Sequence, residues 1–494
     1  MVFPLGGLWT PSHTPSPVSE PLSFLSLAVA AADGEVDGVP VRRLVAAGLS
    51  LLRLSAPLVR ALAGRRAAIL LPTSPQFLVA LAASEGRGAV LVNPLSSPPE
   101  IAYQLADAGV GAVFTNEALA GRLPASMPHV LLDAAPDGAQ WVDDTSRRQL
   151  SLATHEGVRV EGAGDVPGSD DEATIVYTSA LDGYSLGAVG THRNLLANAR
   201  ATIEGAAITG DDHALALLPF SHLFGLVVPA LAPLLAGARV QCMPRFHPTK
   251  AIELLENERV SIVVGVPAVF AALTAVLARR GTPLRAPALR LCICGGAPLA
   301  AALQDDWFEQ SGLELRQGYG LTEAGPVCLF NAIALPNRRG TLGIPFSGVD
   351  VSIQDPQSGD TLPPEHDGEI CVRGDNVSPG YLRVRPGERG LARRGEWLRT
   401  GDLGVRHADG SFSFRGFLKP MFTRNGFNIY PREIERVVGA MPGVEHVRVE
   451  PIPDAARESG IALAVRGAVS EGEVREWCER QLAAYKQPTI VSIG

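Results

Sequence analysis

Short apolar runs alternate with helical patterns along the first half of the chain. The runs that predict buried strands are AAILLP (67–72), GAVLVNP (88–94), AVFTN (112–116) and HVLLDA (129–134). Between them, the segments 75–87 and 98–109 carry apolar residues at helical spacing. The alternation returns further on, at SIVVGVP (261–267) and LRLCICGGAPL (289–299). Continuous apolar strands separated by helices are typical of parallel sheets covered on both faces, so we predict an α/β fold with doubly wound, mostly parallel sheets.

The pattern changes twice after residue 340. Short strand-like runs separated by Gly, Pro and Asp turns predict a small β-barrel-like subdomain at about 340–415. After Gly416 a compact α+β unit of about 75 residues follows, with helical patterns at PREIERVVGAM and SEGEVREWCERQLAAY. We therefore predict a large N-terminal domain over 1–418 and a small mobile C-terminal domain over 419–494, with the boundary near Lys419.

Composition narrows the class of protein. The chain has 494 residues, 46% of them hydrophobic and 19% charged, which is enough for two or three packed domains. Its net charge of −8 and the lack of a basic patch argue against a nucleic-acid partner. The six cysteines are scattered without a C-x-x-C pair, which indicates reduced thiols in a cytoplasmic protein, not a disulfide framework or a zinc site.

Two apolar stretches imitate membrane spans. Leu223–Ala238 and Ile262–Ala278 are both interrupted by proline, and both are shorter than the roughly 20 residues that a span requires. We expect them to form buried helices and strands. The first 20 residues have no basic region before an apolar core, so we predict a Pro/Ser-rich surface segment there, not a signal peptide.

The stretch TIVYTSALDGYSLGAVGTHRNL (174–195) is the strongest candidate for binding chemistry. An apolar run feeds a loop that holds Gly183, Gly187 and Gly190, and a helix start follows at Thr191–Asn194. Strand, glycine-rich loop and helix N-terminus form a typical phosphate cradle. Such a loop normally adds hydroxyls and a lysine. This one has Leu181, Asp182 and Leu186 instead, and the Asp182 carboxylate would repel a phosphate.

The segment from Tyr177 to Leu195 resembles the YTSGTTG-x-PKG-xxx-TH-x-NL signature of the adenylate-forming superfamily and aligns with it without a gap. Further segments follow in the family's order: LPFSHLFGL (218–226), GGAPL (295–299), GYGLTEAG (318–325), TGDLG (400–404) and GFNIYPREIE (426–435). The resemblance covers nearly the whole chain and is greatest to the acyl- or aryl-CoA ligase branch. It implies activation of a carboxylic acid by ATP and Mg²⁺, followed by rotation of the C-terminal domain and transfer of the acyl group to coenzyme A.

The resemblance also assigns expected roles. Tyr319 would stack on adenine, Thr322 would contact the α-phosphate, Glu323 would hold Mg²⁺ and Asp402 would accept the ribose hydroxyls. The remaining matches are Thr178, Ser179 and Gly183 in the phosphate loop, His222, Gly295, Gly296 and Ala297 at the acyl pocket, Gly318 beside Tyr319, Gly426 at the thiol tunnel and Lys419 at the hinge. Each has a structural alternative: Gly318 and Gly320 as turn glycines, His222 as a hydrogen-bonded core histidine and Asp402 as a turn cap.

The phosphate side departs from the family pattern. The family's threonine pair is Leu181 and Asp182 here, its lysine is Leu186, and its arginine before the hinge is Phe417. Pro420 follows the hinge where an acid is usual and should stiffen it. The family's catalytic lysine lies beyond a Y-K-x-P segment. Here that segment is 485–488 and the sequence ends at Gly494, so we expect no residue in that role; Lys486 belongs to the segment itself.

Loss of one preorganised donor costs roughly 10²–10³ in rate, so we expect ATP-dependent adenylation to be very slow or absent. Three interpretations stay open: an active AMP-forming ligase, an enzyme that moves the acyl group of a preformed acyl-adenylate or thioester, and a non-catalytic acyl- or nucleotide-binding partner protein. The thiol would be that of coenzyme A or of an acyl carrier protein. Small residues at 230–237 and the apolar helix at 268–278 suggest an apolar acyl pocket, while the sequence leaves the acyl group and the oligomeric state open.

Overall fold

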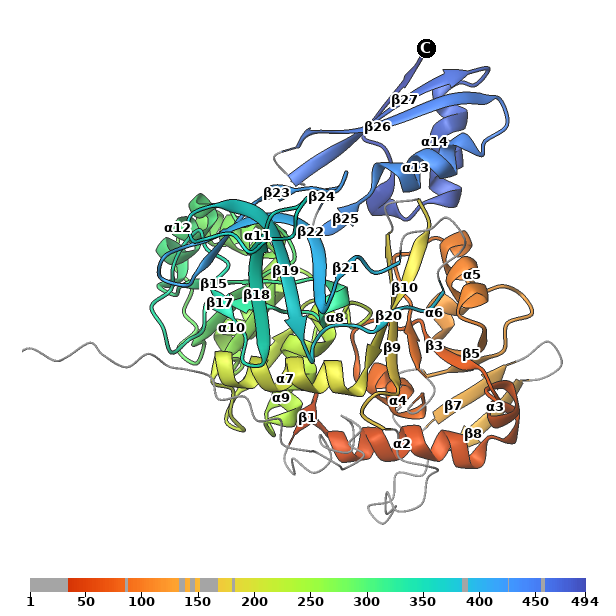
Figure 1. Ribbon diagram of the computed structural model, residues 1–494. Helices are drawn as coiled ribbons and strands as arrows, with labels where there is room; N and C mark the ends of the chain where they lie inside the picture. The colour runs from red at the N-terminus through yellow and green to blue at the C-terminus, as the bar shows by residue number, and fades with distance from the viewer. Residues whose placement is uncertain are drawn as a thin grey trace, which may run out of the picture.

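The computed structural model describes residues 34–84, 88–132, 138–142, 147–151, 168–179, 183–383, 390–424, 426–454 and 458–494. Two large sheets form its main body, a third sheet lies beside them, and a smaller α+β unit carries the C-terminus (Figure 1). Leu181 and Asp182, on which part of the phosphate-loop prediction rests, lie outside the described residues. The α/β class predicted from the apolar runs is confirmed.

The first sheet holds the strands of the chain's early part. Its order is β20 (Gly380–Tyr381), β10 (Ser185–Thr191), β9 (Glu172–Ser179), β4 (Ala89–Leu91), β3 (Arg66–Ile69), β5 (Val110–Thr115), β6 (His129–Leu131), β7 (Gly138–Val142) and β8 (Arg147–Ser151). The strands from β9 to β6 are parallel, and their side chains are buried on both faces because helices cover the sheet. Antiparallel strands extend the sheet at both edges.

The second sheet repeats this design. Its order is β17 (Ile344–Pro345), β16 (Leu329–Phe330), β15 (Leu315–Tyr319), β14 (Leu291–Cys294), β13 (Ile262–Gly265), β11 (His213–Ala216), β12 (Arg239–Cys242), β1 (Glu35–Val36) and β2 (Val39–Pro40). The strands from β12 to β15 are parallel. Cys292 and Cys294 are buried in β14, as expected for small apolar residues of a core strand.

Helices cover the two sheets. They are α2 (Val41–Leu54), α3 (Ala56–Ala61), α4 (Pro75–Ala83), α5 (Pro98–Asp107), α6 (Glu117–Ala120), α7 (His192–Ala206), α8 (Leu223–Leu226), the π-helix η1 (Val227–Leu231), α9 (Ala232–Leu235), α10 (Pro248–Asn257), α11 (Pro267–Arg280), α12 (Ala301–Ser311) and the 3₁₀-helix η2 (Thr322–Ala324). Capping boxes set the starts of α5 and α7, from Ser97 with Glu100 and from Thr191 with Asn194.

The two stretches that imitate membrane spans are buried elements, as predicted. The first forms α8, η1 and α9, and the second forms β13 and the greater part of α11. Across the described residues, no helix has both the length and the apolar character that crossing a membrane requires.

The hairpin of β9 and β10 corrects the expected glycine-rich loop. Gly187 and Gly190 lie within strand β10, paired with Tyr177 and Thr174 of β9. A Cβ atom at Gly187 would come 2.8 Å from Ile175 Cγ2, and one at Gly190 would come 2.6 Å from Thr174 Oγ1. These glycines therefore allow close packing within the hairpin. Helix α7 follows β10, so the local plan is strand, hairpin strand and helix, and the prediction of an open loop running from Gly183 to Gly190 was wrong.

The β-rich region predicted at 340–415 is an antiparallel sheet. It is made of β18 (Val349–Gln354), β19 (Asp367–Gly374), β22 (Trp397–Arg406) and β21 (Arg393–Arg394), with β23 (Phe412–Phe417) along β22. Strand β22 carries TGDLG at its centre. The sheet thereby brings Asp402 toward the carboxyl end of β15.

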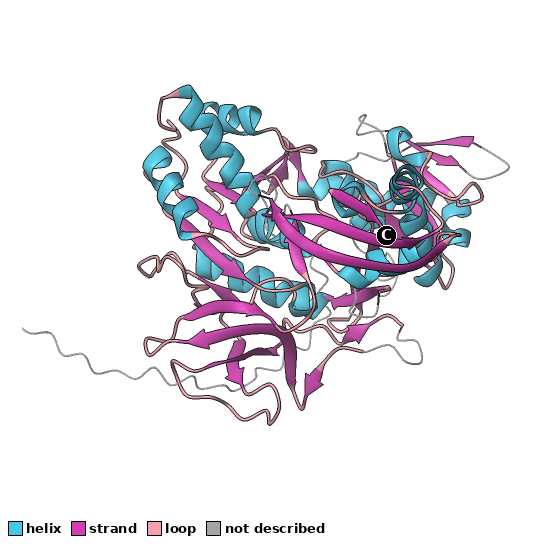
Figure 2. Ribbon diagram, turned by 90° about the horizontal axis from the view of Figure 1, so that it is seen from above, coloured by secondary structure: helices cyan, strands magenta, loops and turns pink. Residues whose placement is uncertain are grey.

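The C-terminal part packs around a hydrophobic cluster of its own, which includes Ile434, Val438, Ile461 and Leu463. Its elements are β24 (Phe422–Arg424), β25 (Phe427–Ile429), α13 (Pro431–Gly439), β26 (Val444–Asp454), β27 (Glu458–Gly467), α14 (Glu471–Gln481), the 3₁₀-helix η3 (Ala484–Lys486) and β28 (Ile490–Ile493). Seen from above, its strands cross in front of the larger body (Figure 2). The domain boundary at Lys419 stays a prediction; that residue lies between β23 and β24.

Candidate active site

A cavity of about 950 Å³ opens where the two large sheets, the β22 sheet and the C-terminal part meet. Ligands of parallel α/β sheets bind beyond the carboxyl ends of the strands, and the loops after β4, β11, β13, β14 and β15 all reach this cavity. The predicted site residues that line it are Thr178, His222, Gly295, Gly296, Ala297, Gly318, Tyr319, Thr322, Glu323, Asp402 and Gly426. The structure therefore brings most of the predicted set into one cleft.

Tyr319 and Asp402 are directly bonded. The Tyr319 hydroxyl donates to Asp402 Oδ2 at 2.8 Å, and the buried position together with the Asp402 charge raises the pKa of that hydroxyl. The other carboxylate oxygen, Oδ1, lies 3.2 Å from Lys419 Nζ, which also donates to the Thr400 carbonyl at 2.9 Å. Burial alone would lower the pKa of Lys419, but Asp402 and neighbouring acidic groups outweigh it and raise that pKa. The cavity thus holds a buried, neutralised carboxylate.

Glu323 in η2 is the second carboxylate of the cleft. Its Oε1 accepts hydrogen bonds from Tyr381 Oη at 2.8 Å and from Thr178 Oγ1 at 3.2 Å. Both donors act on one oxygen, which orients the carboxylate. Among the described residues, no group of three or more His, Cys, Asp or Glu side chains could enclose a metal ion. One carboxylate suits Mg²⁺ that keeps water and phosphate ligands, so Glu323 fits a magnesium ion that a nucleotide carries in.

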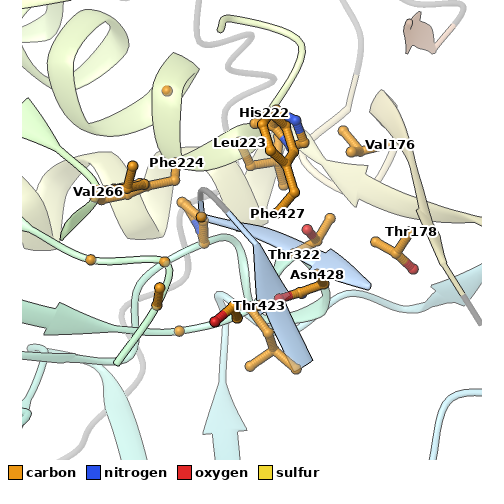
Figure 3. Close-up of a pocket in the computed structure, with 18 of the residues that line it drawn as sticks. Val176, Thr178, His222, Leu223, Phe224, Val266, Thr322, Thr423, Phe427 and Asn428 are labelled. Atoms are coloured by element: carbon orange, nitrogen blue, oxygen red, sulfur yellow. The ribbon is translucent and has the colours of Figure 1, made fainter. Parts of the chain in front are cut away.

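His222 is the N-cap residue of helix α8 and faces the cavity beside Phe427 of β25, with 5.7 Å between ring centroids (Figure 3). Its Nε2 lies 3.2 Å from Asn93 Nδ2. Burial lowers the pKa of His222 to about 4, so the ring is neutral near pH 7. Phe427 in turn stacks on Tyr485 with centroids 4.2 Å apart. The C-terminal part therefore supplies one wall of the cavity.

Gly426 allows this close approach. Its φ is +76°, a left-handed conformation, and a Cβ there would meet Val266 Cγ2 at 3.0 Å. A larger residue would be strained by both the backbone and the contact. Gly426 is thus fitted to bring the C-terminal part against the loop after β13.

Two apolar side chains line the cavity at positions where the resemblance predicts a lysine and an arginine. Leu186 on β10 is 5% exposed and lines the cavity. Phe417 also lines it and packs on Phe414 with centroids 4.9 Å apart. Lys419 approaches the same region, but its ammonium is engaged by Asp402.

Two residues of the predicted site, Gly183 and Ser179, lie near the connection between β9 and β10. Gly183 does not line the cavity: its carbonyl accepts a 2.7 Å hydrogen bond from Arg436 Nε of α13. The Arg436 guanidinium also lies over the Tyr184 ring, 4.3 Å from its centroid. Ser179 is the last residue of β9. Gly183 and Tyr184, just before β10, are thus held by the C-terminal part.

A buried ammonium also joins the two parts of the chain. Lys486 Nζ lies 2.6 Å from Glu433 Oε1 of α13 and 2.7 Å from Glu100 Oε1 of α5. Ser97 Oγ donates to the Gln481 carbonyl at 2.8 Å in the same contact. Lys486 does not line the cavity, whereas its neighbour Tyr485 does. Lys486 is therefore a docking residue in this arrangement.

Sequence reasoning missed Asn93, Tyr381 and Arg436. Asn93 had a usable signal, because it stands near the end of the predicted strand run 88–94 and so falls at the same sheet edge as the motif residues. The sequence carried no signal for Tyr381 and Arg436, because their contacts join segments that are far apart in sequence.

Comparison with known proteins is consistent with this geometry. The AMP-binding enzyme family matches residues 51–382. The chain belongs to this family. Feruloyl-CoA synthase of an Amycolatopsis species is 34% identical over 444 residues, covering 87% of this chain and 84% of the relative. The relatives and the fold place this AMP-binding enzyme family member in the acyl-CoA synthetase branch of the adenylate-forming superfamily, as the motifs predicted.

Two solved structures of related enzymes match with different scores. A malonyl-CoA ligase in a ternary product complex with methylmalonyl-CoA and AMP has a TM-score of 0.78 at 26% identity, covering 95% of this chain and 98% of that one. ATP-bound MatB from Rhodopseudomonas palustris has a TM-score of 0.68 at 28% identity, covering 96% and 95%. Apo MatB has the same TM-score of 0.68 as its ATP complex, so these matches show the fold that the chain shares with the two enzymes.

Proposed function

We propose that this protein is an acyl-CoA synthetase-like enzyme that binds an acyl group and AMP in the cavity and passes the acyl group of an acyl-adenylate to a thiol. The observation that carries the proposal is the convergence of Tyr319, Glu323 and Asp402 in one cleft. Tyr319 offers an aromatic face for adenine, Asp402 a carboxylate for the ribose hydroxyls, Thr322 a hydroxyl for the α-phosphate and Glu323 an oxygen ligand for Mg²⁺.

We propose further that ATP-dependent formation of the adenylate is strongly impaired. A departing pyrophosphate needs cations and hydroxyl donors aimed at its oxygens. The apolar side chains of Leu186 and Phe417 offer neither, and both line the cavity. Two independent losses of about 10²–10³ each would suppress the step by 10⁴ or more, although such losses are rarely additive.

The second half of the reaction has better support. Gly426 and Phe427 lie against the acyl side of the cleft beside His222, so the C-terminal part already borders the place where an acyl carbonyl would sit. Phe224, Val266 and Val269 give that side an apolar lining. Together with the feruloyl-CoA synthase relative, this lining favours an aryl or other apolar carboxylic acid as the acyl source.

The thiol is proposed to be that of coenzyme A, with an acyl carrier protein as the alternative. The described cysteines are free thiols and all but Cys242 are buried, which agrees with a cytoplasmic location.

Two assays run in parallel test the proposal. Release of pyrophosphate is measured with ATP, Mg²⁺, coenzyme A and a panel of feruloyl-type and fatty acids. Thioester formation is measured with the corresponding synthetic acyl-adenylates and coenzyme A. We expect thioester formation well above the solution background and pyrophosphate release at most 10⁻³ of that rate. Pyrophosphate release at a comparable rate would identify an ordinary ligase, and binding of AMP without either activity would identify a non-catalytic binding protein.

A further inference from the structure

Asn93 lies in a turn that the surrounding chain fixes in place. Asn93 Oδ1 accepts a 2.8 Å hydrogen bond from the Leu95 backbone N–H, and the Asn93 carbonyl accepts one from Ser96 N at 2.9 Å. The Arg122 guanidinium donates to the carbonyls of Pro94 and Ser96. The carbonyl end of the Asn93 amide is thus committed to the Leu95 N–H, and the opposite amide orientation would set two donors against each other. The NH₂ group of Asn93 must therefore face His222.

This orientation decides the state of the His222 ring. Asn93 Nδ2 lies 3.2 Å from His222 Nε2, and an amide NH₂ can only donate, so Nε2 must be the bare, accepting nitrogen. In a neutral imidazole the proton is then on Nδ1. Nδ1 has no hydrogen-bond partner among the described residues. It is also not one of the polar atoms that are buried from solvent without a partner, so it is accessible from the cavity that His222 lines.

We infer that Asn93 is a positioning residue that fixes His222 as the Nδ1–H tautomer and thereby makes it a neutral hydrogen-bond donor to the acyl group. The inference deepens the proposed thioester-forming step and rests on it for its catalytic consequence. It excludes His222 as the base that removes the thiol proton, because one ring nitrogen is occupied by Asn93 and the other already carries hydrogen.

The donor suits the charge that develops in that step. As the sulfur–carbon bond forms, the carbonyl electron pair moves onto oxygen; it returns as the carbon–oxygen bond to AMP breaks, and the thiol proton passes to water. An Nδ1–H directed at the oxygen stabilises the intermediate negative charge. A neutral donor also adds no positive charge that would compete for the carboxylates Glu323 and Asp402 of the same cavity.

Nitrogen-15 NMR of histidine-labelled full-length protein tests the tautomer without any activity. The two ring nitrogens have widely separated shifts when one is protonated and the other bare, and His222→Gln assigns the signals by their disappearance. In the wild type at pH 8 we expect Nδ1 protonated and Nε2 bare. In Asn93→Asp, a carboxylate that can only accept should draw the proton to Nε2. A protonated Nε2 in the wild type, or an unchanged tautomer in Asn93→Asp, would overturn the inference.

Turnover of synthetic acyl-adenylate with coenzyme A tests the consequence. Asn93→Asp should lower kcat about 10²-fold, the lower end for loss of one oxyanion donor, with little change in KM. Asn93→Ala leaves the ring without a partner and should lower kcat less. Asn257→Asp, on the exposed face of α10 and bonded only to the Glu253 carbonyl, is the matched control and should leave turnover unchanged. A rise in KM at constant kcat would refute the donor role. If the wild type does not turn over, the proposed function fails, while the NMR result still decides the tautomer.

Discussion

The Tyr319 hydroxyl donates a 2.8 Å hydrogen bond to Asp402 Oδ2 across 83 positions of sequence. The contact joins the carboxyl end of β15, in a parallel sheet, to the middle of β22, in the antiparallel sheet. Lys419, just after β23, pairs with the other carboxylate oxygen of Asp402, Oδ1. Side chains from three separate parts of the chain therefore meet at one carboxylate, which the proposed function assigns to the ribose hydroxyls.

Asp402→Asn should weaken AMP binding about 10- to 100-fold, because hydrogen bonds to a charged acceptor contribute roughly 1.5–3 kcal/mol. Titration calorimetry with AMP measures the loss. Asp350→Asn on β18, which breaks an exposed ion pair with Arg373 of β19, is the matched control and should leave AMP affinity unchanged.

The same substitution leaves Lys419 without its counter-charge. Asp402→Asn should therefore lower the midpoint of thermal unfolding, and Asp402→Asn with Lys419→Met should recover much of the lost stability without recovering AMP binding. AMP affinity unchanged in Asp402→Asn would mean that the ribose is held elsewhere.

Leu186→Lys should raise ATP-dependent pyrophosphate release, because it adds a cation where the proposed function places the departing pyrophosphate. A single preorganised charge supplies about 10²–10³-fold, and because Leu186 is only 5% exposed, the cost of burying an ammonium there should reduce the gain to about tenfold. The double variant Leu186→Lys with Phe417→Arg should release pyrophosphate faster still. The measurement is coupled pyrophosphate release at saturating ATP.

Leu186→Met keeps the volume and apolar character of the site and is the control for this change; it should leave pyrophosphate release at the wild-type level. If both Leu186→Lys variants, with and without Phe417→Arg, fold and still release no more pyrophosphate than Leu186→Met, then the lack of cations at these two positions does not limit pyrophosphate release.

Periodicity predicted the layered core, since an apolar run between two amphipathic helices has few other ways to bury itself. β3, β4, β5, β13 and β14 all lie within the predicted runs or overlap them closely. The motif residues also met as expected, because parallel strands deliver the loops after them to one edge. Tyr319 and Gly295 needed no more than that rule.

The β9–β10 hairpin escaped prediction for a physical reason. Gly187 and Gly190 carry no side chain that would reveal strand alternation, and a glycine-rich segment reads as a loop until its pairing partner is known. The Lys486 contact could not be predicted for a different reason. The carboxylates that hold its ammonium come from α5 and α13, and only the docked C-terminal part brings them together.

Lys486→Met should destabilise the protein by about 3–5 kcal/mol, because Glu433 is 4% exposed and would remain as an uncompensated buried charge. Chemical denaturation measures the free energy of unfolding. Arg480→Met removes an exposed cation paired with Glu476 on α14 and should cost no more than about 0.5 kcal/mol. Equal losses in the two variants would show that the buried triad contributes no more than a surface pair.

Acid should destabilise the protein through His192, the first residue of α7. This side chain is 1% exposed, and burial lowers its pKa from 6.5 to about 4. Between those values the unfolded chain binds a proton that the folded chain refuses, so stability falls as pH drops from 6.5 to 4 and levels off below. At pH 5 the loss from this residue is about 2 kcal/mol relative to pH 7. His192→Gln removes the titrating group, so the difference in unfolding free energy between pH 7 and pH 5 should shrink by that amount. A difference as large as in the wild type would mean that His192 accepts its proton in the folded state.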